Sequence, residues 1–138
     1  MGYTHYFTVK SRIPAEPWAQ FLEAAQDIIK LAKEQGIKLR DSSTKSIVHI
    51  NGAAPEDYED LDIDRTMMGF QFCKTNERPY DVVVVAILCA LSDIVGSYYV
   101  EVSSDGGPPD WVAGQKLASA ALQYNMELPM GMREEEIA

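Results

Sequence analysis

The sequence predicts an α+β domain, in which strands of one sheet are interrupted by helices that pack on it. The chain has 138 residues, which is the size of a single domain. Hydrophobic residues make up 46% of the chain, which is enough for one core. Stretches that alternate apolar and polar residues lie between stretches with helical periodicity, in the order strand, helix, strand, strand, helix, strand, helix.

The first strand and the first helix occupy the N-terminal quarter of the chain. Residues 3–10, YTHYFTVK, alternate and are rich in residues that favour strands. Residues 14–35 predict a helix, because apolar residues from Trp18 to Ala32 recur at helical spacing. Gly36 suits the end of that helix, since glycine adopts the left-handed conformation common there.

Two further strands are predicted in the middle of the chain. Residues 37–44 form either a short strand or a loop, and residues 45–52, KSIVHING, form the second main strand. Residues 53–65 are expected to be an acidic loop. Residues 67–74 form the next strand, with Phe70 and Phe72 on one face.

The C-terminal part begins with a helix at residues 79–95. Val82 to Val85 alone would favour a strand, but the continuation AILCALSDIV makes the apolar segment long enough for a buried helix. The last strand covers 97–104 and a third helix covers 109–125. Residues 1–125 then form one domain, and residues 126–138 form a tail that is mobile or lies on a partner.

The first six elements have the order of the ferredoxin-like β-α-β-β-α-β fold. Right-handed connections then give a four-stranded antiparallel sheet in the order 4-1-3-2, with an extra C-terminal helix. Two helices cover one face of this sheet, and the third covers the other face or packs at its side. The open face, with Tyr6, Thr8, Gln71, Tyr99 and Glu101, is covered by that helix or by a second subunit, and we expect a homo-oligomer.

This topology predicts one polar edge, because the start of strand 1 lies beside the ends of strands 3 and 4. The second and third helices also begin there, and helix N-termini attract anions. The candidate ligand-binding residues at this edge are Tyr3, Thr4, His5, Tyr6, Lys74, Thr75, Tyr80, Asp81, Ser103, Ser104, Asp105 and Trp111.

The composition of this edge suits a small anionic ligand, such as a nucleotide. Lys74 and the helix N-termini would hold a phosphate. The aromatic rings of Tyr3, Tyr6, Tyr80 or Trp111 would stack on a base, and other polar residues would donate hydrogen bonds. No metal or cofactor is expected at this edge.

Several residues of this edge also have other interpretations. A histidine in the position of His5 is more often a hydrogen-bonded core residue than a ligand or base, and Lys74 is equally typical of a solvated turn. Asp81, His5 and Ser103 or Ser104 compose a Ser-His-Asp triad, although no nucleophile-elbow motif is present. Cys73 with His5 is another nucleophile pair. A small hydrolase or transferase, with His5 or Asp81 as general base and Lys74 stabilising charge, is therefore an alternative function.

Charge and composition exclude several classes of protein. The net charge of −9 argues against non-specific binding of nucleic acid and favours, as a third function, an inhibitor that binds a basic partner protein. Asp60, Asp62 and Asp64 have the spacing of a calcium loop, but Arg65 and Gln71 stand where that loop needs Gly and Glu. The two cysteines indicate neither a zinc site nor a disulfide framework. The longest apolar run is about half a membrane span, and no signal peptide is apparent.

The N-terminal hexapeptide Met1-Gly2-Tyr3-Thr4-His5-Tyr6 resembles the opening of a family of small uncharacterised phage and prophage proteins that begin MGYTHYW. Further marks of that family resemble Phe72-Cys73-Lys74-Thr75, Pro79-Tyr80-Asp81, Ser103-Ser104-Asp105-Gly106 and Trp111; Phe7 stands where the family usually has Trp. The resemblance implies a phage or mobile-element origin, and a role in sequestering host defence signals would suit such an accessory protein. The resemblance implies no particular reaction. The low cysteine content favours a reducing cytoplasm, here that of the bacterial host.

Overall fold

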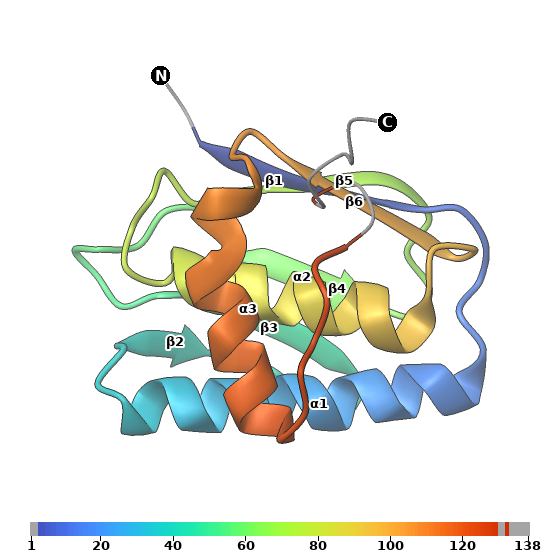
Figure 1. The fold of residues 1–138 in the computed structure, drawn as a ribbon, viewed down its shortest axis with the longest axis horizontal. Helices are drawn as coiled ribbons and strands as arrows, with labels where there is room; N and C mark the ends of the chain where they lie inside the picture. Colours follow the sequence, from blue (N-terminus) through green and yellow to red (C-terminus); the bar gives the residue numbers. More distant parts are fainter. Residues whose placement is uncertain (1–2, 130–131, 133–138) are drawn as a thin grey trace.

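The computed structural model describes residues 3–129 and residue 132 (Figure 1). This part of the chain is α+β, as predicted, with three helices and two small antiparallel sheets. Its elements are β1 (Thr4–Val9), α1 (Ala15–Glu34), β2 (Leu39–Asp41), β3 (Ile47–Gly52), β4 (Leu61–Asp64), β5 (Gly69–Lys74), α2 (Asp81–Val95), β6 (Val100–Ser104) and α3 (Pro108–Leu122).

The predicted four-stranded sheet is not formed. One sheet, which we call sheet A, has the order β5-β1-β6, so the predicted neighbours of the first strand are correct. The second main strand, β3, does not lie beside β5. It pairs with β2 and β4 in a separate three-stranded sheet, sheet B.

The strand that changes the topology lies within the predicted acidic loop. Leu61 and Ile63 are buried and alternate with exposed Asp62, which is the pattern of a half-buried strand. β4 therefore takes the edge of β3 that the prediction assigned to β5. The two sheets still meet at one point, where Glu59 N–H donates to the Lys74 carbonyl (3.1 Å) and Lys74 N–H donates to Glu59 Oε1 (2.8 Å).

Helix α2 is the centre of the core. Every residue from Val83 to Leu91 is buried, because α1, α3 and β6 all pack against it. The three helices lie on the same side of sheet A (Figure 1). A Cβ placed on Gly114 of α3 would lie 2.3 Å from Val85 Cγ1, so the glycine permits the close approach of these two helices.

The C-terminal tail is partly packed on the domain. Gln115 Nε2 donates to the Met126 carbonyl (2.7 Å), and the side chains of Met126 and Met132 are buried. The predicted mobile or partner-bound tail therefore begins with residues that belong to the core. Its remaining residues, 130–131 and 133–138, lie outside the described residues.

The exposed face of β5 is the reverse of the expected one. Tyr6 pairs with Phe72 and Phe7 pairs with Gln71, so Gln71 lies on the face of buried Phe7 and not on the open face. Phe70 and Phe72 point outward and are 62% and 58% exposed. Tyr99, also expected on the open face, precedes β6 and is half-buried.

Within the described residues, no helix combines the length and the hydropathy needed to cross a membrane.

Candidate functional site

The three chain segments that the sequence predicts to converge do lie together. Thr75 N–H donates to the Tyr3 carbonyl (3.1 Å), which joins the end of β5 to the start of β1. Asp105 N–H donates to the Thr4 carbonyl (2.9 Å), and Thr4 N–H donates to Asp105 Oδ2 (3.0 Å), which joins the end of β6 to the same strand. This edge of sheet A is the candidate site.

His5 links two elements at the centre of the site. Its ring is fully buried, with Nε2 2.6 Å from Asp81 Oδ1 and Nδ1 2.7 Å from Ser104 Oγ. Asp81 is the first residue of α2 and Ser104 is the last residue of β6. Asp81, His5 and Ser104, three residues of the predicted Ser-His-Asp arrangement, therefore lie in that order, each within hydrogen-bond distance of the next.

The donors and acceptors of this network have one consistent direction when His5 is neutral. An ionised carboxylate only accepts hydrogen bonds, and Asp81 Oδ1 also accepts one from the Thr75 hydroxyl. His5 Nε2 therefore carries the proton, and Nδ1 accepts the hydroxyl proton of Ser104. In the usual triad the serine faces Nε2, so the roles of the two ring nitrogens are exchanged here.

Tyr3 borders Ser104 and His5. Its ring lies edge-on to the His5 ring, with centroids 5.0 Å apart. A Cβ on Gly106 would lie 2.1 Å from the Tyr3 hydroxyl, so only glycine permits this approach. Burial and the negative charge of Asp81 raise the pKa of Tyr3 to about 12, although its interaction with the Ser104 side chain lowers it, so the hydroxyl remains a proton donor at neutral pH.

Trp111 forms a wall of the site and is not available to stack on a base. Its side chain is fully buried and lies edge-on to His5, with ring centroids 5.3 Å apart. Its Nε1 is buried without a hydrogen-bond partner among the described residues. Its role here is therefore to pack against the imidazole.

Sheet A divides the remaining candidates between its two faces. Successive side chains alternate across a strand, so Thr4, Tyr6 and Ser103 lie on the face opposite to His5 and Ser104. The Tyr6 hydroxyl donates to Asp105 Oδ1 (2.8 Å) on that outer side. The predicted site is thus two groups of residues that share one edge.

Lys74 lies on the outer side, away from His5. Its Nζ is 5.6 Å from the centroid of the Tyr58 ring, and Arg78 Cζ is 5.8 Å from the same centroid. Tyr80 is fully buried, and its hydroxyl donates to the Glu59 carbonyl (2.6 Å). Tyr80 is therefore a core residue, contrary to its expected exposure to a ligand.

The helix N-termini at this edge have most of their N–H groups occupied. α3 begins with Pro108 and Pro109, which have no N–H, and Gly107 N–H donates to Asp110 Oδ2 (2.9 Å). At α2, Asp81 N–H donates to the Arg78 carbonyl (2.8 Å). These termini carry carboxylates of their own, which weakens the expected attraction of an anion.

Cys73 does not act as a nucleophile with His5 in this arrangement. It pairs with His5 across β5 and β1, but its thiol donates to the Glu59 carbonyl at 3.5 Å. Burial, together with the charge of Glu59, raises its pKa to about 12, so the reactive thiolate is scarce.

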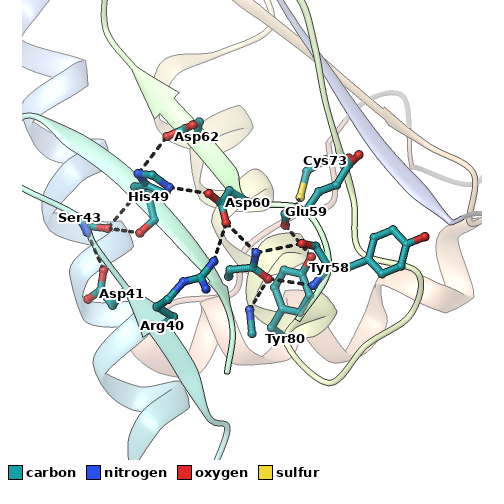
Figure 2. Close-up of polar contacts among 12 residues, drawn as sticks. Arg40, Asp41, Ser43, His49, Tyr58, Glu59, Asp60, Asp62, Cys73 and Tyr80 are labelled. Carbon is teal, nitrogen blue, oxygen red and sulfur yellow. Dashed lines mark hydrogen bonds and ion pairs between the residues drawn. The ribbon is translucent and has the colours of Figure 1, made fainter. Parts of the chain in front are cut away.

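A second polar network, which the sequence interpretation missed, organises the acidic loop (Figure 2). Asn51 is buried and donates to the Tyr58 carbonyl (3.0 Å) and Asp60 Oδ1 (2.6 Å). Asp60 Oδ2 lies 2.8 Å from His49 Nε2, and Arg40 donates to Asp60 Oδ1. The local signals for this network were Asn51-Gly52, interpreted as a strand end, and the spaced carboxylates Asp60 and Asp62, interpreted as part of an acidic loop.

The described residues contain no group of three or more His, Cys, Asp or Glu side chains arranged to hold a metal ion. No protein-family model, curated protein or solved structure matches this chain.

Proposed function

We propose that this protein is a small hydrolase or acyl transferase, with Ser104 as nucleophile, His5 as general base and Asp81 as the residue that orients His5. The observation that supports the proposal is the bridging position of the buried His5, 2.6 Å from Asp81 and 2.7 Å from Ser104. A base within hydrogen-bond distance of a nucleophile, and itself held by a carboxylate, is the geometry that nucleophilic catalysis requires.

In the proposed reaction, Ser104 Oγ attacks the carbonyl carbon of an ester, and its proton passes to His5 Nδ1. The leaving alcohol takes that proton as the acyl–oxygen bond breaks. Water, or an acceptor alcohol, then attacks the acyl-serine and gives its proton to His5 Nδ1; the acyl–Oγ bond breaks, the acid or the new ester leaves, and the proton returns to Ser104 Oγ. Asp81 accepts a hydrogen bond from Nε2–H throughout, which keeps Nδ1 directed at Ser104 and stabilises the positive charge that develops on the ring.

Tyr3 is the proposed donor to the oxyanion. Its hydroxyl interacts with the Ser104 side chain, and its raised pKa of about 12 keeps it protonated. Tyrosine hydroxyls serve this role in other enzymes. The Gly106 N–H donates to Ser104 Oγ (3.0 Å) and positions the nucleophile.

The charges around Tyr3 favour an uncharged or cationic substrate. Asp81, Asp110 and Glu77 all raise the Tyr3 pKa through their negative charge. A phosphate at the same position would be repelled by these carboxylates. An ester or amide without an anionic group is therefore the substrate class that we propose.

A nucleotide-like anion is the second candidate ligand, and the observation that favours it is the pair of cations at Tyr58. Lys74 and Arg78 both lie within 6 Å of the centroid of this ring, which is itself 41% exposed. A phosphate held by the two cations beside an aromatic ring suits a nucleotide. A phage accessory protein acting against host defence stays a prediction from the N-terminal resemblance.

The experiment that tests the proposal is labelling with a fluorophosphonate, which phosphorylates activated serines, followed by mass spectrometry of the peptides. We expect one adduct at Ser104, and hydrolysis of an activated aryl ester that Ser104→Ala abolishes. Asp81→Asn should lower the rate by about 10²–10⁴-fold.

The matched control is Ser103→Ala, because Ser103 is the adjacent serine but points to the opposite face. The Ser103→Ala protein should react with the fluorophosphonate and hydrolyse the aryl ester as the parent protein does. Labelling at Ser103, or ester hydrolysis that survives Ser104→Ala in a folded protein, would exclude the proposed nucleophile.

A further inference from the structure

The outer face of sheet A exposes more apolar surface than a strand face in contact with water normally does. Phe70 and Phe72 are 62% and 58% exposed, and Met68 beside them is 52% exposed. Tyr6 stacks on Phe70 with ring centroids 5.6 Å apart, and Phe70 lies 6.2 Å from Phe72. A contiguous aromatic patch of this kind marks an interaction surface.

No helix among the described residues covers this face. Phe7, Val9 and Val102 point to the opposite side, where they join the core with α2. α3, expected to cover the open face or pack at its side, packs on α1 and α2 instead (Figure 1). The helices of the described residues therefore leave the patch open.

The charges of this face identify its occupant. The outward side chains of the three strands are Thr4, Tyr6, Thr8, Phe70, Phe72, Lys74, Glu101 and Ser103. They include Lys74 and Glu101, and the face is bordered by Lys10 and by Asp105, which accepts from the Tyr6 hydroxyl, so two positive and two negative groups balance there although the whole chain carries −9. Glu101 is further paired with Lys10, at 3.2 Å.

A basic partner protein would be attracted to the acidic surfaces of this protein. The neutral face lacks that attraction, so a basic partner is not its expected occupant. A second copy of the chain, by contrast, can approach on this face without bringing like charges together. We propose that two copies associate through the outer faces of sheet A, around Tyr6, Phe70 and Phe72.

The geometry is that of two stacked antiparallel sheets related by a two-fold axis. Such sheets pack about 10 Å apart, with the side chains of the two faces interdigitating. A two-fold axis places the same aromatic patch on both sides, which makes the interface self-complementary.

The size of the face sets the strength of the association. Three strands of five or six residues span roughly 15 Å by 20 Å. This area is below the ~800 Å² that each partner contributes to a standard interface. We therefore expect a reversible dimer with a Kd of about 10–100 µM, because small interfaces form weak complexes.

Sedimentation velocity across about 5–500 µM protein tests the proposal. We expect the sedimentation coefficient to rise from the monomer to the dimer value, and Phe70→Gln with Phe72→Gln to shift this transition at least tenfold upward in concentration. Both side chains are more than half exposed, so the double variant should retain the parent circular dichroism and melting temperature. The matched control is Tyr98→Gln, since Tyr98 is 74% exposed but lies outside this face.

Salt separates this dimer from a charge-driven one. A neutral apolar interface should hold its Kd within about twofold between low and high ionic strength. A monomer at every concentration would overturn the proposal, and so would a dimer that is unaffected by the two phenylalanine substitutions. A dimer that dissociates in salt would point to a different, charged interface and would also overturn it.

Discussion

Asn51 Nδ2 donates a hydrogen bond to Asp60 Oδ1 at 2.6 Å, and this contact fastens the acidic loop to β3. The oxygen of the same side-chain amide, Asn51 Oδ1, accepts hydrogen bonds from Gly52 N–H (2.7 Å) and Tyr58 N–H (3.0 Å). A neutral amide at this buried position therefore uses both its donors and its acceptor, which a carboxylate of the same shape cannot do.

We expect Asn51→Asp to lower the free energy of unfolding by about 3 kcal/mol or more, because it places a buried carboxylate against the Tyr58 carbonyl and Asp60. Urea denaturation measures this loss. Asn125→Asp makes the same chemical change at an exposed position and should cost little. Equal costs at the two positions would contradict the role of Asn51.

Gly106→Ala should displace Tyr3. The new methyl would lie 2.1 Å from the Tyr3 hydroxyl and 2.9 Å from the ring carbon that carries it. We expect a loss of about 1–3 kcal/mol, part of which Tyr3→Phe restores by removing the hydroxyl. A double-mutant cycle measures the coupling, and additive effects would show that the two groups do not meet.

Gly114→Ala should separate α3 from α2, because its methyl would lie 2.3 Å from Val85 Cγ1. A loss of about 1–3 kcal/mol is expected from overpacking. Adding Val85→Ala should cost less than the sum of the two changes, since it removes the nearer of the two clashing carbons, Cγ1, although Cβ at 2.6 Å remains. Val83→Ala is the matched control, because Val83 is another buried valine of α2 and its effect should simply add to that of Gly114→Ala.

His49 should make stability depend on pH. The hydrogen bond to Asp60, followed by the charge of Asp62, raises its pKa above 6.5, although partial burial opposes this. A raised pKa in the folded state means that the stabilisation is complete below about pH 6.5 and is lost as the pH rises through the folded value. His49→Gln should remove this decline.

The measurement is the difference in the free energy of unfolding between parent and His49→Gln from about pH 5 to 9. Titratable groups that do not contact His49 are the same in both proteins, so their contributions cancel in the difference. The His49 hydrogen bond also lowers the pKa of Asp60, which keeps that carboxylate charged across this range. A difference that does not change with pH would contradict the prediction.

The two cysteines should be inert in the folded protein. Burial raises the pKa of both Cys73 and Cys89 to about 12, and both side chains are fully buried. A disulfide reagent should react with neither thiol in buffer and with both in urea. Rapid reaction of one thiol in buffer would instead identify an accessible nucleophile, and Cys73→Ser would show whether it is Cys73.

Local patterns in the chain were sufficient to predict most elements and the meeting of three segments. The spacing of apolar residues from Trp18 to Ala32 predicts the helix α1 whatever that helix packs against. The length of the apolar segment after Asp81 shows that this segment is a helix and not a strand. Once β1 lies between β5 and β6, the proximity of His5 to Ser104 follows from the antiparallel register.

The pairing of β3 was beyond these patterns, because it depends on competition between edges that are distant in sequence. Leu61 and Ile63 belong to the short strand β4, whose acidic residues gave this segment the composition of a loop. β4 pairs with the edge of β3 in place of β5. Similarly, the alternation of side chains along a strand separates two faces, but it does not determine which of the two faces is buried. Burial of Phe7 and Cys73 in the core decides that Phe70 and Phe72 point outward, because the core accepts only one face of β5.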